Sequence, residues 1–335
     1  MVINHRNVSV NDITMHIAEQ GTGPLVLLLH GFPESWYSWR HQLQPLADAG
    51  FHVVAPDQRG YAGTDQPEDV NQYTMLHLVG DIIGLIHALG EREAVVVGHD
   101  FGAVVAWHTA LLRPDVIRGV VGLSVPPPLR TPEPPLGLAE KKFGKDFYQL
   151  YFQRPGVADA EFAVDIKDTI LRFFFAASGD VATAGPGSKY FPQDPAETEA
   201  APAALAAPGT YSFLNTMPKP LVLPPWLTEA DMDAFAEQYA RNKFTGGLNW
   251  YRNMDRNWEL TAPWAGAMIT APALYVTGTY DGVRTFGDQY AIERVPEMLT
   301  DLRGLLDFQD CGHWTQQERP DETNKALVEF LTGLR

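Results

Sequence analysis

Short apolar runs alternate with segments of helical periodicity over the first third of the chain. The runs cover residues 25–29, 53–55, 94–97 and 120–123. Runs that are apolar throughout, with no polar alternation, are typical of strands buried on both faces of a parallel sheet. Apolar residues between 78 and 89 recur at helical spacing, and Gly90 stands where that helix would end. The alternation predicts an α/β fold, with a mostly parallel sheet flanked by helices.

Related patterns occur at both ends of the chain. Apolar residues alternate on each side of Asn11-Asp12, which predicts an antiparallel hairpin. Further strands are predicted at 273–277 and 305–308, and an amphipathic helix is predicted at 321–335. These elements extend the sheet that the first third of the chain begins.

A mainly helical insert interrupts the predicted sheet. The run Pro126-Pro127-Pro128 cannot continue a strand, because proline has no N–H to donate. The stretch that follows is helix-like and rich in Phe and Tyr, and an Ala/Pro/Gly-rich segment at 183–210 is expected to form a long loop. We therefore divide the chain into a first core part at 1–127, a helical cap (lid) at 128–259 and a second core part at 260–335.

Composition excludes several classes of function. The chain has 335 residues, with 25 Lys and Arg against 41 Asp and Glu, and a formal net charge of −16. Without a basic run it is not expected to bind nucleic acid or an anionic membrane. Its single cysteine, Cys311, excludes an intrachain disulfide and a cysteine-based zinc site. No stretch approaches the ~20 apolar residues of a membrane span, and no signal-like region opens the chain, so a cytoplasmic location is expected.

The strongest local motif is Gly98-His99-Asp100-Phe101-Gly102, which lies between a predicted strand and a predicted helix. It has the small-x-nucleophile-x-small pattern of the nucleophile elbow in the α/β-hydrolase fold, where small neighbours allow a tight turn that projects the central side chain. Asp100 takes the nucleophile position. The alternative interpretation is a strand-to-helix turn in which Asp100 only caps the helix.

Two later residues support the catalytic interpretation. Asp281 follows the strand at 273–277, and His313 follows the strand at 305–308. The ends of parallel strands meet at one edge of a sheet, and the order nucleophile, acid, histidine is that of the α/β-hydrolases. His313 would act as general base, and Asp281 would hold its tautomer and stabilise the imidazolium.

The first long strand ends in His30-Gly31-Phe32-Pro33. In this fold the loop after that strand donates one oxyanion-hole N–H, and the residue after the nucleophile donates the other. The expected donors are therefore the backbone N–H groups of Phe32 and Phe101. An ordinary Gly-Pro turn is the alternative for the first of them.

Taken together, the motifs make the chain resemble the soluble epoxide hydrolases of the α/β-hydrolase superfamily over nearly its whole length. The matching stretches are HGFPESWYSWR at 30–40, DQRGY at 57–61, the elbow at 98–102, YQLYFQ at 148–153, NWYRNM at 249–254 and DCGHWTQ at 310–316. The resemblance implies Asp100 as nucleophile, His313 and Asp281 as the charge pair, and Tyr148 and Tyr251 as acids from the cap. It implies hydrolysis of lipophilic epoxides to vicinal diols through an aspartyl ester.

Other features follow from the same resemblance. No metal or organic cofactor is expected, the partners are a small-molecule epoxide and water, and a homodimer is left open. The residues expected to line the substrate pocket are Pro33, Trp36, Gln149, Phe152 and Trp250.

The tyrosines make chemical sense in this role. Opening an epoxide produces an alkoxide, and a phenol with a pKa of ~10 can hydrogen-bond or protonate it while keeping its own proton at neutral pH. Tyr151 is the main rival to Tyr148, three residues further along. Glu34, after the oxyanion loop, would either orient the water or the ring of His313, or be a surface carboxylate.

Three other functions are alternatives for a chain of this fold. A haloalkane dehalogenase shares the fold and the Asp nucleophile, but it needs N–H donors for the departing halide, and Phe32 and Phe101 supply none from their side chains. A non-catalytic receptor on this fold would be expected to have a broken triad. A serine esterase is excluded, because Asp100 stands at the nucleophile position.

Overall fold

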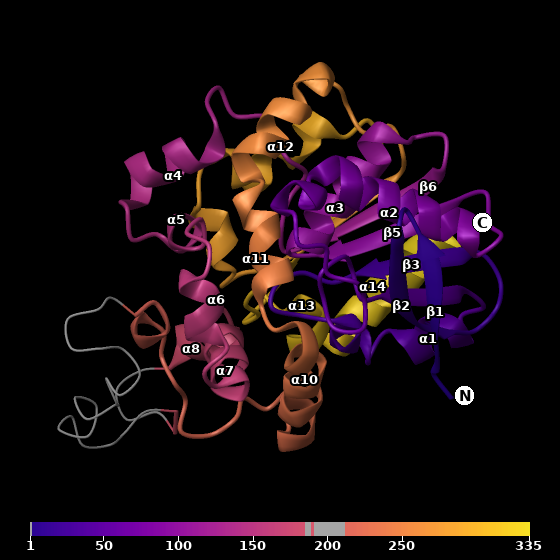
Figure 1. The fold of residues 1–335 in the computed structure, drawn as a ribbon. Helices are drawn as coiled ribbons and strands as arrows, with labels where there is room; N and C mark the ends of the chain where they lie inside the picture. Colours follow the sequence, from indigo (N-terminus) through magenta and orange to yellow (C-terminus); the bar gives the residue numbers. More distant parts are fainter. Residues whose placement is uncertain (1, 185–188, 191–211) are drawn as a thin grey trace.

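The computed structural model describes residues 2–184, 189–190 and 212–335, and an eight-stranded sheet forms its centre (Figure 1). In spatial order the strands are β1 (Asn4–Val10), β2 (Ile13–Gln20), β4 (His52–Pro56), β3 (Leu25–Leu29), β5 (Ala94–His99), β6 (Ile117–Leu123), β7 (Ala273–Gly278) and β8 (Leu302–Phe308). β1 and β2 form an antiparallel hairpin, β2 runs antiparallel to β4, and the strands from β4 to β8 are parallel. The predicted hairpin and mostly parallel sheet are confirmed.

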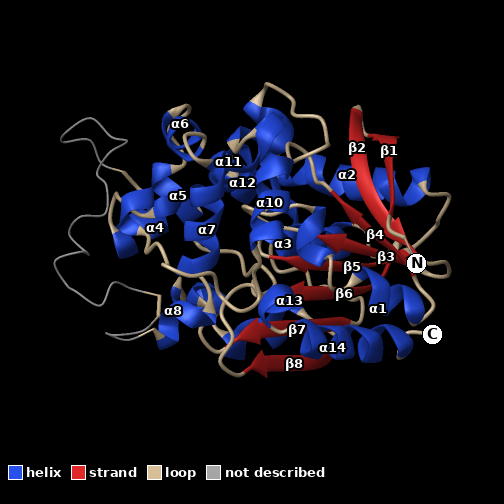
Figure 2. Ribbon diagram, turned by 90° about the horizontal axis from the view of Figure 1, so that it is seen from below, coloured by secondary structure: helices blue, strands red, loops and turns tan. Residues whose placement is uncertain are grey.

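The apolar runs are strands because each must bury both faces. In β3, Leu25, Leu27 and Leu29 pack into one hydrophobic cluster with α2 and α3, whereas Val26 and Leu28 pack into a second with α1 and α14. Successive side chains of a strand point to opposite faces, so both sides of the sheet are covered by helices (Figure 2). The covering helices are α1 (Leu43–Asp48), α2 (Met75–Ala88), α3 (Phe101–Leu112) and α14 (Pro320–Thr332), with the short α13 (Thr315–Glu318) before α14.

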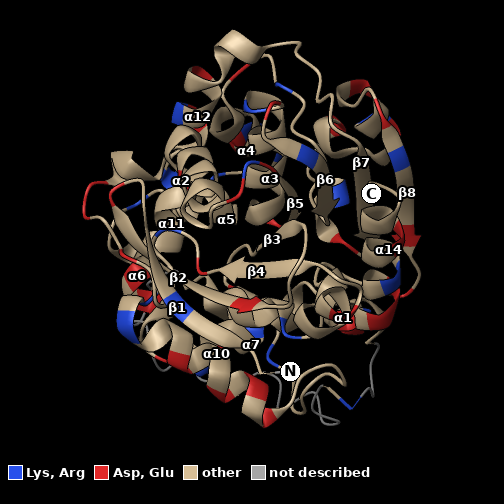
Figure 3. Ribbon diagram, turned by 90° about the vertical axis from the view of Figure 1, so that its right-hand side faces the viewer, with Lys and Arg blue, Asp and Glu red and all other residues tan. Residues whose placement is uncertain are grey.

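Charged residues are absent from the central strands and occur on the outer helices. The central strands β3, β4 and β5 contain no Lys, Arg, Asp or Glu, whereas outer helices such as α14 carry both signs (Figure 3). A buried charge without a partner is costly, so the core strands exclude such residues. The predicted helix at 78–89 and the C-terminal helix are both confirmed, as α2 and α14.

Between β6 and β7 the described residues form helices and short 3₁₀ turns. The helices are α4 (Pro135–Phe143), α5 (Tyr148–Tyr151), α6 (Val157–Phe162), α7 (Ile166–Ala176), α8 (Gly179–Thr183), α10 (Glu229–Asn242), α11 (Thr245–Arg252) and α12 (Met254–Leu260). Figure 1 shows them gathered beside the sheet, with α11 and α12 nearest to α3. The division into two core parts and a cap remains our interpretation of this arrangement.

The 3₁₀ turns are short. Their bounds are Trp36–Trp39, Val70–Tyr73, Leu214–Thr216, Ala262–Trp264, Gly282–Thr285, Asp288–Tyr290 and Ile292–Met298. The loop expected at 183–210 falls almost entirely outside the described residues, and Thr183 itself ends α8. None of the described helices has the length and apolar character needed to cross a membrane.

Candidate active site

Asp100 lies in the turn between β5 and α3, with a backbone φ of 53°. This left-handed conformation costs a non-glycine residue about 1–3 kcal/mol, so the surrounding structure must enforce it. A Cβ on Gly98 would collide with the backbone of Gly102, and a Cβ on Gly102 would collide with the carbonyl of Leu29. The two glycines allow strand, turn and helix to approach closely, as the elbow motif predicts.

His313 lies between two carboxylates. Its Nε2 is 3.2 Å from Oδ2 of Asp100, and its Nδ1 is 3.0 Å from Oδ1 of Asp281. Asp281 follows β7 and is held by the N–H of Val283, which donates to the same Oδ1 at 2.9 Å. The structure therefore brings together the three residues that the sequence predicts as a triad, from the ends of β5, β7 and β8.

The electrostatics around His313 favour an ion pair between its imidazolium and the two carboxylates beside it. Burial alone lowers the pKa of His313, but Asp281 and Asp100 outweigh it and raise that pKa well above the ordinary value. Burial raises the pKa of Asp100. The hydrogen bond and the charge of His313 lower that pKa by a larger amount, so the net pKa is below the ordinary value. In the resting protein Asp100 is therefore ionised, as a nucleophilic carboxylate must be.

The expected oxyanion donors lie at the same carboxylate. The N–H of Phe32 donates to Oδ1 of Asp100 at 2.9 Å. Phe101 is the first residue of α3, where a backbone N–H lies ahead of the helix's own hydrogen-bond ladder. The two oxygens of Asp100 are thus held differently, Oδ1 by the oxyanion loop and Oδ2 by His313.

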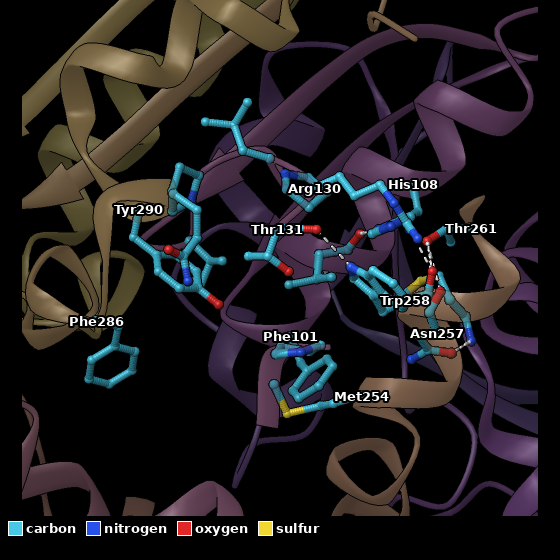
Figure 4. A pocket seen from close by; sticks show the side chains of 18 of the residues that line it. Phe101, His108, Arg130, Thr131, Met254, Asn257, Trp258, Thr261, Phe286 and Tyr290 are labelled. Carbon is cyan, nitrogen blue, oxygen red and sulfur yellow. Dashed lines mark hydrogen bonds between the residues drawn. The ribbon is translucent and has the colours of Figure 1, made fainter. Parts of the chain in front are cut away.

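A cavity of about 220 Å³ opens above Asp100. Figure 4 shows Phe286 and Tyr290 at one end, the group His108, Arg130, Trp258 and Thr261 at the other, and Phe101 and Met254 between them. Most of the lining side chains are apolar or aromatic, and they come from α3, α11, α12 and the segments that follow β6 and β7. Such a lining is typical of a site for a small lipophilic molecule.

Tyr148 and Tyr251 line this cavity together with Asp100, and their ring centroids are 5.9 Å apart. The side-chain amide of Gln149 donates to the hydroxyl of Tyr148 at 3.0 Å, which leaves the phenolic proton free to be donated. Burial, followed by the charge of Asp100, raises the pKa of both phenols well above its ordinary value. Both are therefore protonated donors at neutral pH.

The rival tyrosine does not share this position. Tyr151 is buried, its hydroxyl donates to Oε2 of Glu161 at 2.7 Å, and its ring stacks on Phe213 at 5.6 Å. It is not among the described residues that line the cavity. The structure therefore favours Tyr148 over Tyr151 as the partner of Tyr251.

The expected pocket lining is corrected at four of its five positions. Gln149 lines the cavity, but Pro33, Trp36, Phe152 and Trp250 do not. Trp36 packs edge-on against His5, and Pro33 lies in the oxyanion loop after Phe32. The ring of Trp36 is thus engaged in packing and does not face the cavity.

The two other aromatic residues act from behind the cavity wall. Phe152 packs edge-on against Tyr251, with ring centroids 5.0 Å apart. Trp250 packs against Phe101 and donates its indole N–H to the carbonyl of Arg59 at 3.1 Å. They support the residues that line the cavity and do not reach it.

Glu34 is fully buried, so its interpretation as a surface carboxylate is wrong. One oxygen accepts from the N–H of Gly31 at 2.8 Å and lies 2.7 Å from Nδ1 of His99, while Gln316 donates to the other at 2.9 Å. Nε2 of His99 lies 2.7 Å from the carbonyl oxygen of His313. Both nitrogens of His99 thus lie within hydrogen-bond distance of an oxygen. Glu34 acts on the backbone of His313 through His99, a link that the sequence motif did not reveal.

This chain is similar to known proteins over nearly its whole length. A family model described as "alpha/beta hydrolase fold" matches residues 24–165. The protein named epoxide hydrolase A of Mycobacterium tuberculosis is 43% identical over 98% of this chain and 97% of its own. Epoxide hydrolase 3 of Siraitia grosvenorii is 40% identical over 98% of each chain. The crystal structure of epoxide hydrolase A from Mycobacterium thermoresistibile superimposes with a TM-score of 0.87 at 44% identity, covering 100% of this chain and 99% of that one.

Proposed function

Because this chain belongs to the epoxide hydrolases of the α/β-hydrolase superfamily, we propose that it hydrolyses lipophilic epoxides to vicinal diols through a covalent ester on Asp100. The observation that carries the mechanism is that the Asp100 carboxylate and the phenols of Tyr148 and Tyr251 line one cavity. A nucleophile and two proton donors can then act on the same three-membered ring.

Ring opening is the first step. Oδ2 of Asp100 attacks a ring carbon and the bond from that carbon to the ring oxygen breaks, while Oδ1 stays with the N–H of Phe32. The oxygen takes hydrogen bonds and then a proton from the pair Tyr148 and Tyr251, whose buried phenols have raised pKa values and readily regain a proton. The product of this step is a hydroxyalkyl ester of Asp100.

Ester formation prepares the second step. It removes the charge of Asp100, which is one of the two carboxylates that hold the pKa of His313 high. The pKa of His313 then falls, and the proton that it releases replaces the one that the phenols gave up. His313 becomes a neutral imidazole, oriented by Asp281 and ready to act as a base.

Ester hydrolysis completes the cycle. His313 takes a proton from a water whose oxygen attacks the carbonyl carbon of Asp100, and the N–H groups of Phe32 and Phe101 stabilise the oxyanion. The bond between the carbonyl carbon of Asp100 and Oδ2 breaks. The leaving alkoxide, which carries Oδ2, takes the second proton of the water, and the diol departs. Asp100 is again a carboxylate and His313 is again protonated.

The decisive experiment is to trap the ester. In a His313→Gln variant Asp100 should still be alkylated by an aryl epoxide, but the ester should persist because no base activates water. Intact-protein mass spectrometry should show one added substrate mass, and peptide mapping should find it on Asp100. Asp100→Asn, which keeps the shape of the side chain, should show none.

The same proteins also distinguish this proposal from the dehalogenase alternative. We expect diol from aryl and alkyl epoxides and negligible halide from 1-haloalkanes, because the cavity offers phenols for an alkoxide. Absence of the adduct in a folded, ligand-binding His313→Gln protein would overturn the covalent mechanism. Halide release as fast as diol formation would overturn the assigned reaction.

A further inference from the structure

The backbone around His313 is hydrogen-bonded at three successive residues. The N–H of His313 donates to the carbonyl of Ala177 at 2.8 Å. The N–H of Gly312, just before it, and the N–H of Trp314, just after it, both donate to the side-chain carboxylate of Glu318, at 2.9 and 3.1 Å. One side chain therefore holds the chain on both sides of the proposed base.

The carboxylate of Glu318 also binds the helical segment between β6 and β7. Its Oε2 accepts from the N–H of Gly179, the first residue of α8, at 2.9 Å. Figure 2 shows α8 facing the ends of β7 and β8. The two segments lie in close contact, because a Cβ on Gly312 would be 2.3 Å from the backbone nitrogen of Gly179. The indole N–H of Trp314 adds a bond to the carbonyl of Phe174 in α7, at 2.7 Å.

Glu318 is buried, and no Lys or Arg pairs with it in the part of the chain that the structure describes. Burial raises the pKa of its carboxyl group, and the three N–H groups lower that pKa by a smaller amount, so the net pKa is above the ordinary value. Folding therefore disfavours the ionised form of Glu318, and its charge costs free energy at neutral pH. Such a cost beside a reacting group points to a role other than stability.

We propose that Glu318 is a positioning residue for His313, which keeps the imidazole where it can take a proton from water during ester hydrolysis. This inference rests on the proposed function and adds a residue to its second step. The imidazole has two side-chain partners, Asp281 at Nδ1 and Asp100 at Nε2. Ester formation removes the charge of Asp100, so Asp281 and the backbone must then hold the ring in place. A displacement of about 1 Å can cost about 10²-fold in rate.

A carboxylate away from His313 provides the matched control. Glu161 in α6 accepts from the hydroxyl of Tyr151 at 2.7 Å, the hydroxyl of Ser212 at 2.6 Å and the N–H of Leu214 at 3.1 Å. Like Glu318, it therefore binds three donors from separate parts of the chain. Since none of them belongs to the segment around His313, Glu161→Gln makes the same chemical change without touching the proposed base.

The test measures the two chemical steps separately, by single turnover of an aryl epoxide. A Gln at position 318 offers one acceptor oxygen where Glu318 uses two, and its own N–H groups face backbone N–H groups. We expect Glu318→Gln to slow ester hydrolysis about tenfold or more and to change the rate of alkylation of Asp100 by less than about twofold. The ester should then accumulate during turnover, as intact-protein mass spectrometry of acid-quenched samples would show.

Two further variants complete the series. Glu318→Asp keeps the charge on a side chain that is one methylene shorter, so its rate of ester hydrolysis should lie between those of Glu318→Gln and the wild-type protein. Glu161→Gln should leave both steps unchanged. If Glu318→Gln does not fold, Glu318→Asp is judged by the same difference between the two steps.

The outcomes separate the two proposals. Equal slowing of both steps in Glu318→Gln would assign Glu318 to the fold alone, and an unchanged rate of ester hydrolysis would show that its contacts do not position His313. Either result, or slowing in Glu161→Gln to the same degree, would overturn the role of Glu318 while the proposed hydrolysis stands. If the wild-type protein forms neither ester nor diol from an aryl epoxide, the proposed function itself fails.

Discussion

At the scale of single residues, the site depends on the protonation states of a few side chains. Asp100 is only partly exposed yet ionised, because His313 and the N–H of Phe32 stabilise its charge. Tyr251 is buried and Tyr148 is partly buried, and both are neutral because desolvation and the charge of Asp100 oppose their ionisation. The proposed nucleophile and the proposed acids therefore hold opposite protonation states in one cavity, as the proposed ring opening requires.

Removing the phenols should slow ring opening and spare ester hydrolysis. General acids contribute about 10²–10⁴-fold in rate, and two phenols share this one developing charge. We expect Tyr148→Phe and Tyr251→Phe each to slow alkylation of Asp100 about tenfold or more, and the double variant to be slower than either. Stopped-flow measurement of a single turnover separates the two steps.

Tyr151→Phe is the control for that series, because it removes a hydroxyl that donates to Glu161 and not into the cavity. It should leave the alkylation rate nearly unchanged. A larger loss in Tyr151→Phe than in Tyr148→Phe would reverse the assignment of the two tyrosines.

The pairing of Asp281 with His313 makes a prediction about pH. His313 must be neutral to act as a base, and the charge of Asp281 raises its pKa. In Asp281→Asn that pKa falls, so the neutral form persists to lower pH and the acidic limb of the ester-hydrolysis rate should shift to lower pH. The maximal rate should also fall, because the amide holds the imidazole tautomer less well.

The measurement is the single-turnover rate of ester hydrolysis across pH for both proteins. An acidic limb that stays in place, or that moves to higher pH, would show that His313 is not the titrating base. The wild-type protein supplies the reference profile under the same conditions.

At the scale of elements, the site depends on how closely β5, its turn and α3 approach the end of β3. A Cβ on Gly102 would meet the carbonyl oxygens of Leu29 and His30, which are backbone atoms that cannot swing away. The helical Gly137 in α4 is exposed and has no atom within 4 Å of such a Cβ. A close backbone contact thus requires glycine at position 102, whereas no such contact requires it at position 137.

Replacing each by Ala should show the difference. We expect Gly102→Ala to lower the free energy of unfolding by about 1–3 kcal/mol or more, as overpacking does. Gly137→Ala should raise it by about 0.5–1 kcal/mol, because Ala favours a helix interior. Urea unfolding measures both. If Gly102→Ala proved as harmless as Gly137→Ala, the close contact at the elbow would be excluded.

At the scale of the whole molecule, the sequence predicts best what depends on neighbouring residues. Buried strands carry their own pattern, and the elbow at Asp100 is a five-residue motif, so both were predictable. The positions of Asp281 and His313 were predictable because the carboxyl ends of parallel strands lie at one edge of the sheet. Trp36 was misplaced because a motif does not reveal which side of a loop an aromatic ring will take. A homodimer and a cytoplasmic location stay predictions.

Other features depend on contacts between distant segments and leave no local pattern. Arg130 meets the cavity wall only because α12 brings Trp258 to it from 128 residues away. Glu34 is buried only because His99 and Gln316 converge on it. The lining face of α3 had a usable signal in the spacing of residues 101, 104, 108 and 111, but that spacing alone does not distinguish a cavity from a packed core.

The course of the cavity along α3 also bears on how such an enzyme can diversify. The helix starts directly after Asp100, so its first turn is constrained by the proposed chemistry, whereas Val104, His108 and Leu111 line the cavity further along the helix. A bulkier residue at one of these positions shortens the accessible length by about one helical turn, or 5.4 Å, without moving Asp100. Single substitutions on this face of α3 can therefore change the length of the cavity one step at a time. A lineage can in this way explore longer or shorter substrates by single mutations while its reaction stays the same.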